Sequence, residues 1–388
     1  MSAYGVWGKK PYRVVYKKMM VKESVFLVIS AIELTMGLLD NCNVVIPMSR
    51  YILWIFLLYY GVMVVAQEHK RWEWILLIFL LGGGVLLYLN SGLNIGIKLP
   101  LYLYAMRDID KEKYCKMVLL VILGVTVCTA VAAKWSDFGS MYFESGYDRG
   151  IGGYRYCLGY ANPNRATGLV LMAMIFGLAA FGGKMSWKTY ALSAAAFTIL
   201  YLFTDSRTSY YIGMVMLAGG FVLKRIHGTR VCRAIFVCTL IILFGMLLIS
   251  FGAACHIDND FMRLVNKIIS GRMNQLADYT GDERYVLPYI ENWHLFGSRE
   301  NHNGYDMGYV QLFYYYGVIP GICYVAFIVL GVVRAWKNQN DLFILLILGL
   351  CVFLFMEDMY FSNFVPMHFV MTFAAVIICN RNKEGTDT

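Results

Sequence analysis

Residues 235–254 read IFVCTLIILFGMLLISFGAA, a run without a single charged side chain. A run of about 20 apolar residues is long enough to cross the hydrocarbon core of a bilayer as one α-helix. Arg230 and Arg233 stand just before this run, and the positive-inside rule places such residues at the cytoplasmic end of a span. The stretch therefore predicts a transmembrane helix that runs from the inside to the outside.

The composition of the whole chain points the same way. Its 388 residues are 59% hydrophobic and only 15% charged, and the mean hydropathy is +0.57. A soluble domain carries about 25% charged residues, so a water-soluble enzyme and a disordered protein are both excluded. The net charge of +9 is not by itself a nucleic-acid signal, because its meaning depends on the side of the membrane that holds the charges.

Similar apolar runs recur along the chain and predict an all-α polytopic membrane protein. The segment at 92–106 is the weakest of them, because it is short and contains Lys98 and Pro100. Twelve runs place both termini in one compartment, and we expect a single integral membrane domain over residues 1–388. The predicted spans are 24–41, 46–67, 73–90, 92–106, 117–134, 166–183, 189–204, 209–223, 235–254, 307–333, 341–357 and 362–379.

Basic residues decide the orientation of these spans. The basic N-terminal stretch is followed by no small-residue cleavage site, so we expect it to anchor the first helix in the cytoplasm. Two long segments, 135–165 and 255–306, then lie outside, and loops of this length are usually functional. The other connections that are rich in Lys and Arg, and therefore predicted to be cytoplasmic, are 68–72, 107–116, 184–188, 224–234, 334–340 and the C-terminal tail.

The basic residues predicted to lie outside are mostly arginine, whereas lysine prevails inside. A guanidinium group binds phosphate bidentately, and a charge near the hydrocarbon layer costs roughly 2.5–3.5 kcal/mol, so it is rarely kept without a partner. Arg207 lies in the turn Thr204-Asp205-Ser206-Arg207-Thr208, where a surface pair with Asp205 or a snorkelling side chain is the alternative explanation. The outside arginines are Arg50, Arg149, Arg155, Arg165, Arg207, Arg263, Arg272, Arg284 and Arg299.

Carboxylates and aromatic rings accompany these arginines in both outside segments. A carboxylate near a substrate hydroxyl can act as a general base, and aromatic rings can stack on sugars. An interfacial aromatic belt explains the rings equally well. Asp306 differs from the other carboxylates because it opens the segment Asp306-Met307-Gly308-Tyr309, which leads into a helix, and helix capping is its structural alternative.

Other chemical signals are weak or absent in the sequence. The ten cysteines form no C-x-x-C pair, and the six histidines form no zinc motif, so we predict neither a disulfide framework nor a metal. Asp108-Ile109-Asp110 and Asp258-Asn259-Asp260 match a metal-binding pattern that is common by chance. There is no phosphate-binding loop of the kind that hydrolyses ATP, and no cofactor is expected.

Four segments in this order carry a resemblance to a known family. They are Gly159-Tyr160-Ala161-Asn162-Pro163-Asn164 followed by Gly168, Asp205-Ser206-Arg207-Thr208, Ser270-Gly271-Arg272, and Leu295-Phe296-Gly297 with Asp306-Met307-Gly308-Tyr309 to Gly317 and Gly321. Over about residues 155–325 the chain resembles the O-antigen ligase and polysaccharide polymerase (Wzy-type) family of bacterial membrane proteins. Ligase-type members often carry a His where this chain has Asp306, with His302 four residues earlier, whereas polymerase-type members more often have Asp. The resemblance therefore favours a polymerase with a GT-C-like fold.

The resemblance implies transfer of a growing glycan from polyprenyl diphosphate to a new lipid-linked repeat unit at the outer face of the cytoplasmic membrane. The departing diphosphate needs positioned cations, each worth about 4 kcal/mol at 4 Å and an effective dielectric constant near 20. We expect catalytic roles for Asp306, His302, Arg272 and Arg207. We expect substrate binding by Arg165, Arg155, Arg299, Asn162, Asn164 and Tyr309.

Three other functions remain open at this point. A ligase would transfer the glycan to a different acceptor, and a scaffold would have no catalytic role. A transporter or flippase also commonly has twelve spans, but it often carries charges near the middle of the bilayer, and the spans here are nearly free of charge. The expected partners are the lipid-linked oligosaccharide, the growing polysaccharide, the bilayer, a chain-length regulator and a flippase, and no nucleic acid.

Overall fold

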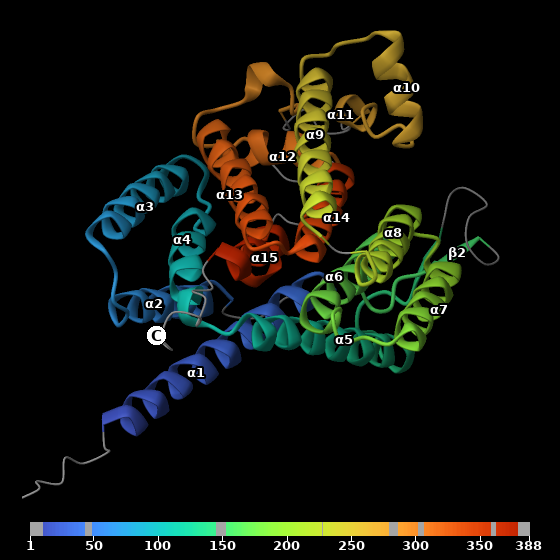
Figure 1. The fold of residues 1–388 in the computed structure, drawn as a ribbon. Coiled ribbons are helices and arrows are strands. Elements are labelled where there is room, and N and C mark those ends of the chain that lie inside the picture. Colours follow the sequence, from blue (N-terminus) through green and yellow to red (C-terminus); the bar gives the residue numbers. More distant parts are fainter. Residues whose placement is uncertain are drawn as a thin grey trace, which may run out of the picture.

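The computed structural model describes residues 11–42, 49–144, 153–226, 228–278, 286–301, 306–357 and 362–378, and this part of the chain is mostly helical (Figure 1). Helices that are both long and apolar supply the membrane character expected from the sequence. Five of them have the length and composition needed to cross a bilayer, so the chain is an all-α membrane protein. They are α3 (Arg71–Ser91), α5 (Lys111–Trp135), α6 (Pro163–Phe181), α9 (Thr229–Ala254) and α13 (Val318–Lys337).

The remaining helices of the bundle are shorter or less apolar than these five. Every predicted span falls on one or more helices of the described structure. Part of the core lies where α6 meets the last helix, since the Phe176 ring packs edge-on against Phe369 and Phe373. These further helices are α1 (Pro11–Asp40), α2 (Ser49–Val65), α4 (Ile95–Ala105), α7 (Trp187–Thr204), α8 (Arg207–Leu223), α14 (Asp341–Met356) and α15 (Phe369–Ile378).

Two predicted spans are interrupted rather than continuous. The span at 307–333 is divided into α12 (Gly308–Gln311), the π-helical turn η3 (Leu312–Tyr316) and α13. Gly317 makes the break with a φ of 100°, and a side chain there would collide with the backbone nitrogen of Gly297. The span at 362–379 contains only the short turn η4 (Val365–Met367) and α15, so its first part is irregular backbone.

The two long segments that are predicted to lie outside contain small elements that hydropathy does not reveal. The first holds an antiparallel hairpin of β1 (Tyr142–Glu144) and β2 (Tyr154–Tyr156), in which Tyr142 pairs with Tyr156. The described part of the second holds two helices and one short turn, which lead the chain across the end of the bundle. These are α10 (Asp260–Ile268), α11 (Gln275–Asp278) and η2 (Ile290–Asn292), and a further turn, η1 (Met106–Asp108), follows α4.

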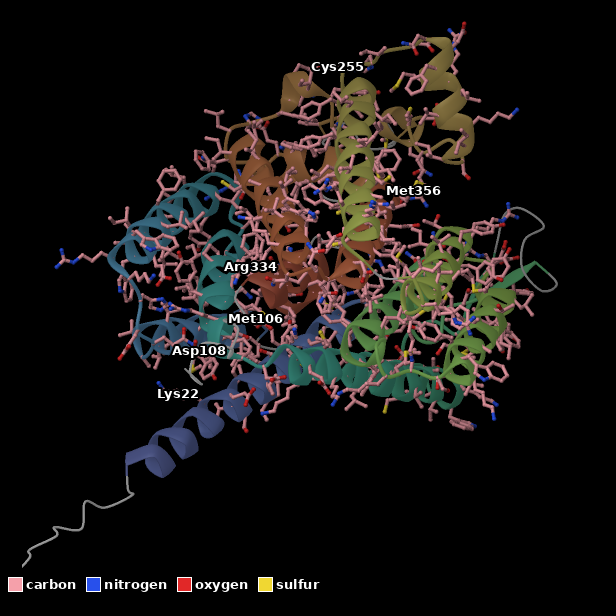
Figure 2. All side chains as sticks on the ribbon, in the orientation of Figure 1. Lys22, Met106, Asp108, Cys255, Arg334 and Met356 are labelled. Atoms are coloured by element: carbon pink, nitrogen blue, oxygen red, sulfur yellow. The ribbon has the colours of Figure 1, made fainter. Side chains whose placement is uncertain are left out.

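Helix ends that are predicted to share a side of the membrane also meet in the structure. At the predicted inner ends, the Lys113 ammonium lies 2.6 Å from the Glu23 carboxylate, and the Lys22 ammonium donates to the Ala66 carbonyl oxygen. In the view of Figure 2, Lys22 and Asp108 lie low in the molecule, whereas Cys255 and Met356, at predicted outer ends, lie above them. The ends of α1, α2 and α5 that are predicted to be cytoplasmic therefore lie together.

Candidate functional site

Arg272 lies between two carboxylates that come from distant parts of the chain. After α10 the chain turns through Ser270 and Gly271, which have φ angles of 61° and 79°, and this turn presents Arg272 to the bundle. Its Nη2 donates to Oε1 of Glu357 at 2.7 Å, and its Nη1 lies 3.2 Å from Oδ2 of Asp306. We call Arg272, Asp306 and Glu357 the carboxylate–arginine cluster.

Close packing of α12 on α14 brings the two carboxylates together. A side chain at Gly308 would place its Cβ 2.0 Å from the carbonyl oxygen of Leu354, so the approach requires glycine. Asp306 lies two residues before Gly308, and Glu357 directly follows the last residue of α14. The fold of this corner therefore determines where Asp306 lies.

The charges of the cluster assign different roles to its members. Burial alone lowers the pKa of Arg272, but the carboxylates of Glu357 and Asp306 outweigh burial, and the pKa is raised above its usual value. The side chain of Glu357 is 5% exposed, whereas that of Asp306 is 34% exposed. Arg272 therefore stays charged, and the buried Glu357 carboxylate neutralises it. Asp306 is the member of the cluster whose side chain is accessible to a ligand.

The Gly308→Ala substitution tests this packing. The added methyl group must push α12 away from α14, so we expect a loss of about 1–3 kcal/mol of stability, as in other overpacked sites. Thermal unfolding in detergent measures the effect. Gly245→Ala in α9 is the matched control, because nothing lies within 4 Å of its added Cβ. Equal unfolding temperatures for the two variants would show that the contact is not tight.

A second polar group forms where α6 begins and α7 ends. The Asn162 side chain caps α6 by accepting from the backbone N–H of Arg165 at 2.8 Å. Arg155, on β2, donates through Nε to the Thr204 carbonyl oxygen at 2.8 Å and through Nη2 to Oδ1 of Asn164 at 2.9 Å. Arg155 therefore fastens the hairpin to two helix ends, which is a structural role.

Arg207 is the first residue of α8. Its Nε lies 3.5 Å from Oδ1 of Asp205, and its side chain is 61% exposed. An exposed ion pair of this kind contributes only about 0–1 kcal/mol, so the guanidinium group can exchange Asp205 for another anion at little cost in free energy. The surface pair with Asp205 that was the alternative explanation is present, and it leaves Arg207 accessible.

Packing of α8 against α14 relates this second group to the carboxylate–arginine cluster. Gly349 faces Met216, and Gly219 faces Leu345, so a step toward the end of α14 corresponds to a step toward the start of α8. The two helices are therefore antiparallel. Arg207, the first residue of α8, lies at the same end of this pair as Glu357, and both groups belong to one end of the bundle.

The other residues predicted for the site are placed differently. Arg299 is exposed in the segment 286–301, and no hydrogen bond to another described residue fixes its position relative to the cluster. Tyr309 is fully buried, and its hydroxyl donates to the Cys351 carbonyl oxygen at 3.3 Å, so the ring belongs to the core. His302 lies outside the described residues.

A buried ion pair within the bundle was missed by the sequence reasoning. Glu33 of α1 and Lys98 of α4 are both 0% exposed, and Nζ of Lys98 lies 3.1 Å from Oε1 of Glu33. Tyr60 donates its hydroxyl to the other carboxylate oxygen of Glu33 at 2.5 Å. The signal that could have revealed the pair is a charge well inside each of two apolar spans, Glu33 in 24–41 and Lys98 in 92–106, since such charges are rarely kept without a partner.

This ion pair also supports the irregular backbone before α15. Lys98 donates to the Asn363 carbonyl oxygen, and the Val365 N–H donates to Oε1 of Glu33 at 3.1 Å. Backbone that is not helical is tolerated at membrane depth only where protein or water satisfies its polar groups. Glu33 and Lys98 provide those partners, which explains how the last predicted span can be interrupted.

Comparison with other proteins adds no assignment. No protein-family model matches the chain, and no curated protein matches it. Among the described residues, no three His, Cys, Asp or Glu side chains are grouped so that they could hold a metal ion. What the structure defines is an α-helical membrane protein with a charged site at one end of its bundle.

Proposed function

We propose that this protein polymerises lipid-linked oligosaccharide repeat units into a surface polysaccharide, with polyprenyl diphosphate as the leaving group. The observation that carries the proposal is the carboxylate–arginine cluster, which keeps a partly exposed Asp306 at the same end of the bundle as the exposed Arg207. The type of reaction is proposed from the sequence resemblance, and the carboxylate–arginine cluster contains side chains that suit this reaction.

The proposal includes a topology of twelve spans in the bacterial cytoplasmic membrane, with both termini in the cytoplasm. The distribution of Lys and Arg supports this orientation, and so does the meeting of the predicted inner helix ends. In this orientation the cluster faces the outside, where the lipid-linked repeat units are presented. A chain-length regulator and a flippase are the protein partners that such a reaction requires.

Asp306 is the general base of the proposed reaction. Its carboxylate accepts the proton of the acceptor hydroxyl while that oxygen attacks the anomeric carbon of the growing glycan. The bond from the anomeric carbon to the diphosphate oxygen breaks, and polyprenyl diphosphate leaves with the bonding electrons. Arg272 is a positioning residue, because it fixes Asp306 from one side and is itself balanced by the buried Glu357.

Arg207 and Arg165 are the cations proposed for the departing diphosphate. Arg207 is exposed at the start of α8, and Arg165 is half-buried in the first turn of α6. Helix N-termini carry partial positive charge, which adds to the attraction for an anion. Each guanidinium at about 4 Å from a phosphate oxygen contributes on the order of 4 kcal/mol at an effective dielectric constant near 20.

Transport of a lipid-linked glycan is the second candidate, and one observation favours it. Glu33 and Lys98 form an ion pair inside the bundle beside an interrupted helix, an arrangement that transporters use at the middle of the membrane. A ligase, which would use the same outer site with another acceptor, is the third. These functions predict different glycans in cells.

Deletion of the gene distinguishes the three candidates. A polymerase predicts that single-repeat lipid-linked glycan accumulates at the outer face and that long chains disappear. Accumulation on the cytoplasmic face would favour the transporter. Long chains that persist without attachment to their final acceptor would favour the ligase.

The Arg207→Ala variant tests the proposed diphosphate contact. We expect a decrease in polymer of about 10²–10³-fold, since removing one group that stabilises a developing anion has effects of this size. Glycan length and amount in membranes that hold equal protein give the measurement. Arg263→Ala is the matched control, because Arg263 is also an exposed arginine paired with aspartate, Asp258, but lies in α10. Equal effects of the two substitutions would remove Arg207 from the site.

A further inference from the structure

One apolar side of α10 is exposed on the surface of the protein. Phe261, Leu264 and Ile268 are 60%, 57% and 71% exposed. Residues three and four positions apart lie on the same side of a helix, so these three side chains form one ridge, which we call the α10 ridge. The basic residues Arg263 and Lys267 are also exposed, but they lie on a different side of the helix. The exposed surface of α10 is therefore amphipathic.

Another side of α10 packs on the end of α9 that the sequence predicts to be the outer one (Figure 1). Met262 is 6% exposed, and its Cε lies 3.1 Å from the place that a Cβ on Gly252 would take. Gly252 lies two residues before the end of α9, on the same side of that helix as Phe244 and Leu248, which are 50% and 73% exposed. Because α9 has the length and composition of a membrane span, its exposed apolar side chains contact lipid. The α10 helix therefore lies at the outer end of the lipid-facing side of α9.

A tryptophan marks the depth of this contact in the membrane. The ring of Trp293 packs against the ring of Phe251 in α9, with the ring centroids 5.2 Å apart. Tryptophan side chains are enriched where the hydrocarbon core meets the polar layer of a bilayer. Phe251 directly precedes Gly252, on which Met262 packs. The α10 helix is therefore at the level of this boundary.

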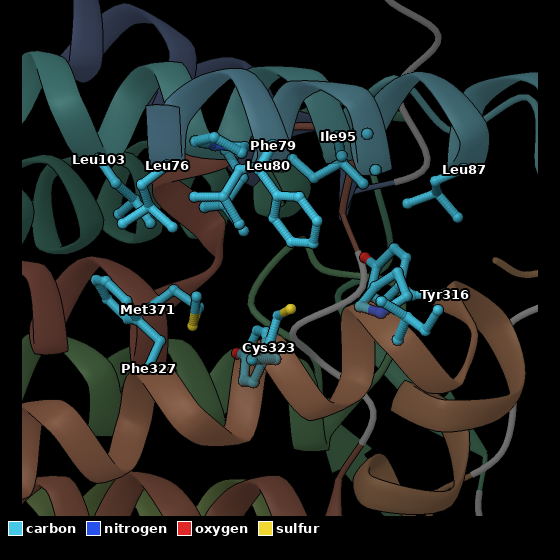
Figure 3. Close-up of a pocket in the computed structure, with 18 of the residues that line it drawn as sticks. Leu76, Phe79, Leu80, Leu87, Ile95, Leu103, Tyr316, Cys323, Phe327 and Met371 are labelled. Carbon is cyan, nitrogen blue, oxygen red and sulfur yellow. The ribbon is translucent and has the colours of Figure 1, made fainter. Parts of the chain in front are cut away.

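The α10 ridge is separate from the large apolar cavity within the bundle. That cavity has a volume of about 950 Å³ and lies between α3 and α4 on one side and α13 and α15 on the other. Figure 3 shows Phe79 of α3 and Phe327 of α13 on its opposite walls. No described residue of α9 or α10 lines this cavity. The ridge therefore belongs to the outer surface of the protein and not to the wall of the cavity.

The position of α10 also determines the position of Arg272. The backbone N–H of Gly271 donates to the Asn266 carbonyl oxygen at 2.7 Å, and the N–H of Met273 donates to Oδ1 of Asn266 at 3.0 Å. These two hydrogen bonds attach the residues on both sides of Arg272 to α10. A helix that is fixed at the membrane surface therefore holds the carboxylate–arginine cluster near that surface.

We propose that α10 lies in the lipid–water boundary of the outer leaflet and inserts the α10 ridge among the phospholipid acyl chains. Helices that lie in this boundary have Phe and Leu toward the acyl chains and Lys and Arg toward the headgroups, as α10 does. Phospholipid is the partner of the ridge because α10 continues the lipid-facing side of α9 at Gly252. This inference concerns a surface and does not depend on the glycosyltransferase proposal.

Photocrosslinking of the full-length protein in phosphatidylcholine nanodiscs tests the proposal. A benzophenone amino acid replaces Phe261 in one variant and, in the matched control, Arg263, whose side chain is 65% exposed on the polar side of α10. A third variant carries the benzophenone at Leu248 of α9 as the reference for lipid contact. We expect phosphatidylcholine adducts at position 261 in an amount similar to that at position 248, and their loss at position 263. Crosslinks from position 261 to a second protein chain, no adduct there, or equal lipid adducts at positions 261 and 263 would overturn the proposal.

Two variants with the same change in net charge test the insertion of the ridge. Leu264→Glu combined with Ile268→Glu places two carboxylates on the ridge, whereas Lys267→Glu lowers the net charge by the same amount on the polar side. With the benzophenone at position 261, we expect the first variant to lower lipid adducts by about tenfold, because the ridge loses its apolar contact with the acyl chains. We expect no change from Lys267→Glu. Equal adducts in the two variants would contradict the inference, and if the ridge variant does not fold, the comparison of positions 261 and 263 gives the answer.

Discussion

The Asp306→Asn variant is expected to lose polymer formation by about 10²–10⁴-fold, the range observed when a general base is removed. The amide has the shape of the carboxylate but cannot accept the proton of the acceptor hydroxyl. The change also leaves Arg272 paired with Glu357 at 2.7 Å, so we expect membrane abundance close to that of the unmodified protein. Glycan length and amount in membranes with equal protein content give the measurement.

Two further variants complete this experiment. Asp258→Asn removes an exposed carboxylate of the same loop that is paired with Arg263, and we expect no loss of polymer from it. His302→Ala tests the other candidate for the general base, because the resemblance implies that either Asp306 or His302 accepts the proton. Loss of polymer in His302→Ala together with normal chains in Asp306→Asn would transfer the proton-accepting role to His302.

The Glu33→Ala variant is expected to lose about 3–5 kcal/mol of stability, because it leaves the buried Lys98 ammonium without its carboxylate. It also removes the acceptor for the Val365 N–H at the start of the irregular segment before α15. Thermal unfolding in detergent, followed by the loss of a monodisperse elution peak, measures the effect.

Two control variants separate the buried charge from other effects of the substitution. Glu33→Leu combined with Lys98→Met removes both charges, and we expect it to be more stable than Glu33→Ala, since an apolar pair leaves no uncompensated ion. Glu23→Ala removes the ion pair with Lys113, whose side chain is 55% exposed, and the acceptor for the Asp110 N–H, and we expect a change of about 1–2 kcal/mol. Unfolding of Glu33→Ala at the same temperature as Glu23→Ala would show that the buried pair does not stabilise the bundle.

The sequence predicts the helices well because hydropathy records contact with lipid directly. The run at 235–254 is the second part of α9, and the capping residue Asn162 marks the start of α6 as its position before Pro163 suggests. Local signals of this kind need no knowledge of distant residues. The predicted count of twelve crossings is a finer statement, and in the part of the chain that the structure describes five helices meet the criteria for a complete span.

Features that depend on distant contacts could not be predicted from local patterns. Arg272 and Glu357 are 85 positions apart, and Glu357 at the end of an apolar run has the pattern of a solvated helix end. Glu33 and Lys98 are separated by 65 positions and meet only when α1 and α4 pack. The irregular backbone before α15 depends on the Glu33–Lys98 pair, so hydropathy alone predicts a continuous span there.

The central claim is that this chain joins lipid-linked repeat units at the face of the membrane where Asp306 lies. The most direct measurement uses purified protein in liposomes and follows glycan length and free polyprenyl diphosphate together, starting from a lipid-linked repeat unit. We predict a ladder of longer glycans with one polyprenyl diphosphate released for each new linkage, and neither product with Asp306→Asn. Transfer of the repeat unit across the bilayer without any linkage or release would contradict the account.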